Sequence, residues 1–184
     1  MRLTIDWQNR DTLIHRIGSP FGFGEWDWEY VLRERQNLHL CKVVFGYQFH
    51  SQHYDTEKLK QNLQSQFTQA LASLGHSELL FVPLAAGYGE HLFTDIIRDI
   101  ISADIAVFET SDKNPNVMIE LGVALTWGVS VWLIKKGGTG GTPTDVAGLS
   151  WAEYDQDGEW FRSQDHMGSL RAMIDRAMRK KVAK

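Results

Sequence analysis

The stretch of sequence that decides the fold runs from residue 104 to residue 134 and reads DIAVFETSDKNPNVMIELGVALTWGVSVWLI. It opens with a short apolar run at 104–108, which predicts a buried strand, and it closes with another at 130–134. Between them a helix is predicted over 115–127, because Asn114 is a favourable N-cap residue and Pro115 suits the first helical position. The stretch therefore predicts two strands joined by a helix, as in a parallel sheet.

The same alternation of strand and helix extends on both sides of this stretch. The further elements predicted are strands at 41–46, 79–83 and 149–154 and helices at 56–74, 91–102 and 169–181. From residue 41 to residue 135 the strand segments are almost entirely apolar, which is typical of parallel strands buried on both faces by helices. With right-handed crossovers, the chain is predicted to form a doubly wound parallel sheet in a three-layer αβα arrangement.

Composition and charge exclude several classes of function. The chain has 184 residues, and its 19 Lys and Arg against 23 Asp and Glu give a formal net charge of −4, so the basic surface of a nucleic-acid binder is missing. The single cysteine, Cys41, excludes an intramolecular disulfide and a cysteine-rich zinc site. No apolar run reaches the ~18 residues of a membrane-spanning helix, and the N-terminus lacks the apolar core of a signal peptide. We expect a cytoplasmic protein that binds neither nucleic acid nor membrane.

Residues 1–40 precede the regular pattern and are predicted to form an N-terminal arm, with the α/β domain covering 41–184. Gly and Pro residues at 18–24 indicate a loop, and 25–36 can form a helix with Trp28 and Val31 on its apolar side. Two interpretations remain open at this point. The arm packs its aromatic residues on the domain, or it serves as a dimerisation or docking arm.

The candidate site is expected in the loops that follow the strands, because doubly wound sheets bind ligands at the carboxyl ends of their strands. Glu120 lies in the second turn of the helix predicted at 115–127, within an apolar stretch. A carboxylate there either reaches a polar partner or has a raised pKa. Gly122 lowers helix stability by about 1 kcal/mol relative to Ala, which suggests that something approaches the backbone closely. His50 and His53 lack a third ligand at suitable spacing, so no metal site is expected.

The pattern Asn-Pro-Asn-Val-x-x-Glu-Leu-Gly-x-Ala at 114–124, after a strand that begins with Ala-Asp, resembles the nucleoside 2-deoxyribosyltransferase superfamily. It also resembles the TIR-like nucleotide-binding proteins of bacteria, which share a flavodoxin-like architecture. The first strand and the aromatic loop after it, Val-Val-Phe-Gly-Tyr-Gln-Phe-His at 43–50, are similar to the start of the deoxyribosyltransferases. The segment at 143–149 is similar to TIR-like relatives. The resemblance covers roughly residues 41–155.

The resemblance implies a catalytic role for Glu120. In the transferases the motif's glutamate is the nucleophile that takes the anomeric carbon of the sugar, and in catalytic TIR domains a similarly placed glutamate supports cleavage of the nicotinamide–ribose bond. The transferases carry an aspartate six residues earlier, where this chain has Asn114, with Asp112 close enough to substitute. Nicotinamide leaves NAD as a neutral base and needs no general acid, so this departure favours NAD cleavage over deoxynucleoside transfer. Asp95 is the nearest candidate for a further substrate-binding aspartate of the family, offset by one residue.

The predicted function is therefore cleavage of the N-glycosidic bond of a nucleotide, with NAD as the leading substrate and with no metal or separate cofactor. Glu120 is the predicted catalytic residue, and the residues predicted to bind substrate are Phe45, Gly46, Tyr47, Asp95, Asp112, Asn114, Asn116 and Gly122. The resemblance further implies a homo-oligomer, an activating protein partner and a role in bacterial antiphage defence. Two alternatives stay open, a non-catalytic nucleotide-binding signalling module and a nucleoside 2-deoxyribosyltransferase. A purely structural role is the competing interpretation of Glu120 itself.

Overall fold

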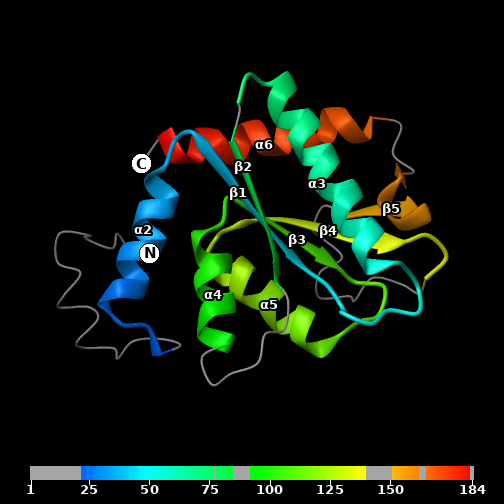
Figure 1. Cartoon of the computed structure of the whole chain (residues 1–184), viewed down its shortest axis with the longest axis horizontal. Coiled ribbons are helices and arrows are strands. Elements are labelled where there is room, and N and C mark those ends of the chain that lie inside the picture. The colour runs from blue at the N-terminus through cyan, green and yellow to red at the C-terminus, as the bar shows by residue number, and fades with distance from the viewer. Residues whose placement is uncertain (1–21, 77, 85–91, 140–150, 162–164, 183–184) are drawn as a thin grey trace, which may run out of the picture.

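A six-stranded sheet runs through the centre of the molecule (Figure 1). The computed structural model describes residues 22–76, 78–84, 92–139, 151–161 and 165–182. The strand order is β2-β1-β3-β4-β5-β6, in which β1 to β5 are parallel and β6 is antiparallel to β5. The strands are β1 (Leu40–Gly46), β2 (Glu78–Leu84), β3 (Ile105–Glu109), β4 (Ser130–Lys136), β5 (Trp151–Asp155) and β6 (Trp160–Phe161).

Helices cover both faces of the sheet, so the predicted doubly wound, three-layer α/β fold is confirmed. One face carries α3 (Thr56–Ser73) and α6 (His166–Val182), and the other carries α4 (Leu92–Ser102) and α5 (Pro115–Thr126). A short 3₁₀ turn, η4 (Gln156–Gly158), precedes β6. Among the described residues, no helix combines the length and the apolar content needed to cross a bilayer.

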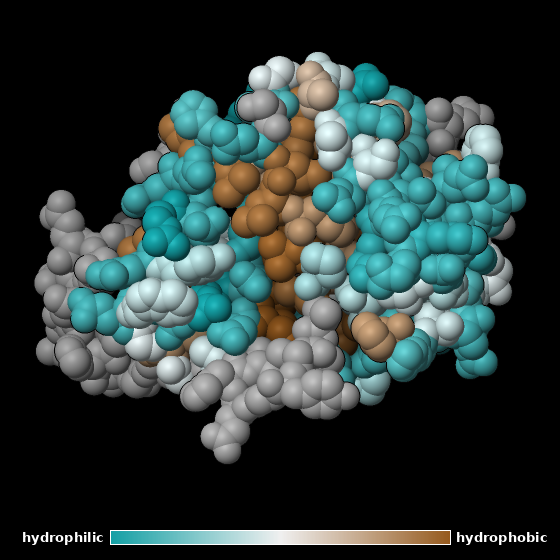
Figure 2. All heavy atoms as spheres, in the orientation of Figure 1, coloured by the Kyte–Doolittle hydropathy of each residue, from teal (hydrophilic) through white to brown (hydrophobic). Residues whose placement is uncertain are grey.

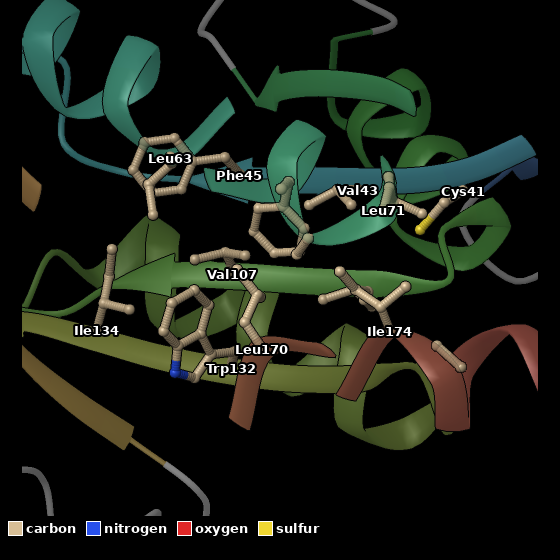
Figure 3. Packing of buried hydrophobic residues seen from close by; sticks show 14 of the residues in the cluster. Cys41, Val43, Phe45, Leu63, Leu71, Val107, Trp132, Ile134, Leu170 and Ile174 are labelled. Carbon is tan, nitrogen blue, oxygen red and sulfur yellow. The ribbon is translucent and has the colours of Figure 1, made fainter. Parts of the chain in front are cut away.

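The core is divided by the sheet into two hydrophobic clusters, because successive side chains of a strand point to opposite faces. Val43 and Phe45 of β1 belong to the cluster under α3 and α6, whereas Val44 belongs to the cluster under α4 and α5. Figure 3 shows the first cluster, in which strand residues lie between Leu63 of α3 and Leu170 of α6. Burial on both faces explains why the central strands β1, β3 and β4 are largely apolar.

The edge strand β2 is visible from outside. Figure 2 shows a hydrophobic band down the middle of one face, where Figure 1 places β2 between the helices of the two layers. The side chains of residues 79–83 in this strand are half-buried. Pro83 has no backbone N–H, and a proline within an edge strand limits pairing with a further strand.

The described part of the predicted arm forms a helix, α2 (Glu25–Gln36), that packs on α4. Val31 is buried in the cluster under α4 and α5, and the Trp28 ring lies 5.6 Å from the ring of Trp127. Arg98 of α4 donates a hydrogen bond of 3.0 Å to Asp27 of α2. Residues 22–36 thus pack as the first interpretation predicts, and residues 1–21 lie outside the described residues.

The sequence did not predict β6, and the sheet is consequently mixed rather than wholly parallel. β6 has only two residues, too few for a periodic pattern to be recognised. It follows a tight turn in which Gln156 and Asp157 have φ values of 49° and 58°, the left-handed region. Parts of two loops that follow predicted strands, residues 85–90 and 140–143, lie outside the described residues.

Candidate functional site

A cavity of about 320 Å³ lies at the carboxyl end of the sheet, as expected for a doubly wound fold. It is bounded by the loop after β1, the end of β2 and the first turns of α4 and α5. Its lining residues are Tyr47, Phe49, Leu84, Phe93, Ile96, Asn114, Asn116, Val117, Ile119 and Glu120. An apolar wall with a few polar groups and a volume near the lower end of the usual range is typical of a small-molecule site.

Glu120 is the acidic side chain among the described residues that line this cavity. It lies in the second turn of α5 and is only 8% exposed, and its Oε2 atom has no hydrogen-bond partner among the described residues. Burial raises the pKa of Glu120 to about 7, because an ionised carboxylate is disfavoured where water is excluded. A buried carboxyl group with an unpartnered oxygen at the wall of a cavity is a candidate contact for a ligand.

Gly46 at the end of β1 makes room for this carboxylate. A Cβ atom at this position would lie 2.5 Å from Cδ1 of Phe108 and 2.7 Å from Oε2 of Glu120. Both distances are shorter than van der Waals contact. The close approach of helix α5 to strand β1 therefore requires a glycine here. Gly46 is thus placed beside the predicted catalytic group.

Replacing Gly46 with alanine is expected to destabilise the fold by about 1–3 kcal/mol, the usual effect of an extra methyl group in a filled core. The substitution also forces Phe108 or the Glu120 carboxylate to move. Urea-induced unfolding followed by circular dichroism measures the change. An unchanged unfolding midpoint would show that the space beside Glu120 is larger than the structure indicates.

The wall formed by the loop after β1 depends on ring stacking and on one amide contact. The Tyr47 ring lies 4.9 Å from the Phe45 ring at an interplanar angle of 19°. Phe45 is fully buried, so it supports Tyr47 from behind and does not itself line the cavity. Asn114 donates from Nδ2 to Oε1 of Gln48 at 3.1 Å, which joins this loop to the start of α5.

The side chain of Asn114 has partners for both of its polar atoms. Its Oδ1 accepts a hydrogen bond of 2.8 Å from the backbone N–H of Asn116, which is the predicted N-cap contact. Its Nδ2 is used by Gln48. Asn114 and Asn116 both line the cavity, but Asn114 primarily fixes the helix start and the loop.

Five of the predicted residues do not line the cavity: Phe45 and Gly46, whose positions are given above, and Asp95, Asp112 and Gly122. Asp95 is 52% exposed at its side chain and pairs with Arg98 at 2.9 Å, on the side of α4 that meets α2. Asp112 is buried, with Oδ1 3.6 Å from Nε2 of His53, and does not line the cavity. Gly122 is exposed on the outside of α5, and a Cβ there would meet no described atom within 4 Å. The close approach expected at Gly122 therefore has no source within the described part of the chain.

A second buried carboxyl group, Glu109 at the end of β3, was missed by the sequence reasoning. It accepts hydrogen bonds from the backbone N–H of Ser111 at 3.1 Å and from the hydroxyl of Tyr154 at 3.1 Å. Burial raises the pKa of Glu109 to about 7 against the opposing effect of these bonds. It lies outside the cavity lining and, unlike Glu120, has partners. The only signal in the sequence was the position of Glu109, a charged residue at the end of an apolar run.

The apolar part of the cavity wall was also missed. Phe93, Ile96 and Ile119 line the cavity, and none of the three was among the predicted site residues. Within the described ranges, no group of three or more His, Cys, Asp and Glu side chains is arranged to hold a metal ion.

Fold and site together define a three-layer α/β protein with a buried carboxyl group at the carboxyl edge of its sheet. No protein-family model matches the chain, and no curated protein matches it.

Solved structures of three kinds are similar to the chain at low sequence identity. A 2-deoxyribosyltransferase from Bacillus psychrosaccharolyticus is 19% identical over 71% of this chain and 96% of its own, with a TM-score of 0.42. A diflavin flavoprotein A3 from Nostoc sp. is 12% identical over 78% of this chain and 93% of its own, with a TM-score of 0.42. An azoreductase from Bacillus anthracis is 12% identical over 78% of this chain and all of its own, with a TM-score of 0.35. Similarities of this size carry no conclusion about activity.

Proposed function

We propose that this chain cleaves the N-glycosidic bond of a nucleotide, with Glu120 as the catalytic carboxylate. The observation that carries the proposal is the side chain of Glu120, which lines the cavity, is almost fully buried and has an Oε2 atom without a hydrogen-bond partner among the described residues. Breaking an N-glycosidic bond needs a carboxylate that stabilises or captures an oxocarbenium-like anomeric carbon. The motif at 114–124, which resembles two families with this chemistry, supports the same role.

The proposed reaction has two steps. The Glu120 carboxylate attacks the anomeric carbon as the bond from this carbon to the base nitrogen breaks, and the bonding electron pair leaves with the base. The resulting glycosyl ester is then hydrolysed by water, which returns the carboxylate and gives the free sugar. In a transferase, a second base would take the place of water.

The leaving group is the point at which this site favours NAD. Asn114 has both polar atoms of its side chain engaged and carries no acidic proton, so it cannot protonate a departing base. The pyridinium nitrogen of NAD becomes neutral when it accepts the electron pair, and it needs no proton. No Lys or Arg is among the described lining residues, so we place the nicotinamide riboside half in the cavity and the phosphates outside it. The role in antiphage defence is implied by the sequence resemblance alone and is not part of this proposal.

Two incubations of the purified chain test the proposal, one with NAD and one with a deoxynucleoside plus a different free base. Chromatography detects the released base. Nicotinamide release is the expected result, whereas base exchange would assign the chain to deoxyribosyl transfer. If neither product forms, a melting temperature that rises with added nucleotide would favour the non-catalytic binding module.

The pH dependence of the reaction follows from the raised pKa of Glu120. A nucleophilic carboxylate is active when ionised, so kcat/KM is expected to rise with pH and to level off above a pKa of about 7. A rate that falls through this range would instead require Glu120 to act as an acid. Burial also raises the pKa of Glu109 to about 7, so this group could produce the same profile. The Glu109→Gln variant is the control, and its kcat/KM should still rise with pH.

A further inference from the structure

A second and larger cavity, of about 490 Å³, lies at the edge of the sheet opposite to Glu120. It adjoins the first residues of β4 and β5 and one side of α6, and we call it the amino-edge cavity. The lining residues that decide its chemistry are Ser130, Trp132, Trp151, His166, Ser169 and Arg176. No described residue lines both cavities. The volume is within the range of small-molecule sites.

The register of the sheet accounts for the opening. Trp151, the first residue of β5, pairs with Leu133, so the first three residues of β4 extend beyond the start of β5. Within the described part of the chain, these three residues pair with β3 alone. Helix α6 borders the opening with Ser169 and Arg176, which lie seven residues apart and therefore on one side of the helix.

Aromatic rings form one part of the cavity wall. The ring of Trp132 is 5.4 Å from the ring of His166, and Figure 3 shows it beside Leu170 of α6, so packing fixes its position. Trp151 is half-exposed, with the ammonium group of Lys135 over its ring at 4.4 Å from the centroid. No other aromatic ring among the described residues stacks on Trp151. A planar ligand ring can pack here and gain the extra stabilisation of ring pairs.

Arg176 is the one charged side chain among the described residues that line the cavity. Its guanidinium group has no ion-pair or hydrogen-bond partner in the described part of the chain, whereas Lys181 of the same helix pairs with Asp104. The hydroxyl of Ser130 lies in the lining, and Nζ of Lys180 is 3.4 Å from it. Two cations and a hydroxyl donor therefore gather on one side of the cavity.

His166 contributes a neutral ring to this lining. Gln66 donates from Nε2 to the carbonyl of Gly158 at 2.6 Å, so its Oε1 atom is the one that meets Nε2 of His166 at 2.5 Å. An amide oxygen only accepts hydrogen bonds, so Nε2 of His166 carries the proton. Burial lowers the pKa of His166, and the ring is uncharged at pH 7. The charge of the lining thus comes from Arg176.

We propose that the amino-edge cavity binds a small molecule that carries a planar aromatic ring and a phosphate group. The ring packs against Trp151 and Trp132, and the phosphate meets Arg176 and the hydroxyls of Ser130 and Ser169. A guanidinium group binds phosphate oxygens through paired N–H donors, and charge strengthens these hydrogen bonds. The candidate site has the opposite charge, because its one charged lining residue in the described chain is Glu120. The second site is independent of the proposed function.

Isothermal titration calorimetry of the full chain with 1-naphthyl phosphate tests this site. The probe has an aromatic ring and a phosphate but no N-glycosidic bond, so its binding does not depend on the chemistry proposed for Glu120. The expected result is saturable binding, with 1-naphthol and inorganic phosphate each bound at least about tenfold more weakly than the probe. No binding of the probe would overturn the proposal, and so would inorganic phosphate or 1-naphthol that binds as tightly as the probe.

Matched variants locate the bound probe. Arg176→Gln is expected to raise the dissociation constant about tenfold, the usual effect of losing a charge-assisted hydrogen bond. Arg171→Gln, at an exposed position of α6 outside the lining, should bind as the wild type does. Circular dichroism checks that each variant is folded. A folded Arg176→Gln variant with an unchanged dissociation constant, or equal weakening in Arg171→Gln, would overturn the assignment of the phosphate to this cavity.

The aromatic part of the site has its own pair of variants. Trp151→Ala removes the half-exposed ring and is expected to raise the dissociation constant at least about fivefold, since stacking on an aromatic side chain contributes ~1–3 kcal/mol. Trp160→Ala removes an exposed indole of β6 that does not line the cavity, and it should leave binding unchanged. A folded Trp151→Ala variant that binds as tightly as Trp160→Ala would overturn the placement of the ring.

Discussion

Replacing Glu120 with glutamine is expected to abolish turnover while the chain stays folded. The amide keeps the size of the side chain but cannot form the bond to the anomeric carbon or stabilise its positive charge. Loss of the catalytic nucleophile lowers kcat by about 10³-fold or more. Release of base from NAD, measured by chromatography for the wild type and for Glu120→Gln, gives the result. Turnover that survives the substitution would remove Glu120 from the mechanism.

The same variant separates a functional Glu120 from a purely structural one through its stability. Burial raises the pKa of Glu120 from 4.5 to about 7, so the folded chain binds more protons than the unfolded chain between these values. The free energy of unfolding therefore falls as pH rises from about 4.5 to about 7, by on the order of 3 kcal/mol for this group. Glutamine removes the charge, and Glu120→Gln is expected to be more stable than the wild type at pH 8 and similar to it at pH 4.5.

A matched control is the other buried carboxyl group. The pKa of Glu109 is raised to a similar value, but its carboxylate accepts hydrogen bonds from Ser111 and Tyr154, so Glu109→Gln is expected to gain less stability at pH 8 than Glu120→Gln. If Glu120→Gln lost stability at pH 8, Glu120 would be a carboxylate held by partners, and its structural interpretation would be favoured.

Local patterns were sufficient to predict the parts of the fold that depend on local rules. The helix at 25–36 was predicted with the bounds that α2 has, and the start of α5 followed from Asn114 as N-cap and Pro115 as first helical residue. Apolar runs located β1, β3 and β4 because a strand buried on both faces leaves a nearly unbroken run. β6 was not predicted, because its two residues form a strand only through pairing with β5 and have no sequence pattern of their own.

The site was less predictable, because the direction of a side chain depends on neighbours far away in the sequence. Asp95 was a reasonable ligand candidate by position, but Arg98 draws its carboxylate toward α2. Glu109 meets Tyr154, 45 residues further along the chain, and no local pattern anticipates that contact. Phe93 was not predicted as a site residue, because helical spacing does not distinguish a core face from a cavity wall.

A second large effect is expected from Lys181, which joins the C-terminal helix to the start of the sheet. Its ammonium group lies 2.8 Å from Oδ2 of Asp104, and the exposed fractions of the two side chains are 4% and 5%. It also donates to the backbone carbonyls of Leu40 at 2.6 Å and Asn37 at 3.0 Å, just beyond the end of α2. One side chain of α6 thereby holds the entry to β1 and the residue that precedes β3.

Lys181→Met is expected to lower the free energy of unfolding by about 3–5 kcal/mol, the usual effect of removing one partner from a buried ion pair. The substitution keeps the apolar stem but leaves the Asp104 carboxylate and two carbonyl groups without their cation. Burial already raises the pKa of Asp104 while Lys181 opposes this effect, so losing the lysine favours the protonated carboxyl further. Equilibrium unfolding in urea measures the loss, which is a large fraction of the ~5–15 kcal/mol that stabilises a typical domain.

The neighbouring lysine provides the matched control. Lys180 is exposed and reaches only the hydroxyl of Ser130 at 3.4 Å, so Lys180→Met should change the unfolding free energy by no more than about 0.5 kcal/mol. Asp104→Asn completes a double-mutant cycle. Asparagine carries no charge, so the loss of Lys181 in this variant leaves no buried carboxylate unpaired. The double variant is then expected to lose less stability than the sum of the two single variants. Equal effects for Lys181→Met and Lys180→Met would show that the ammonium of Lys181 is solvated and that α6 is held by its apolar face alone.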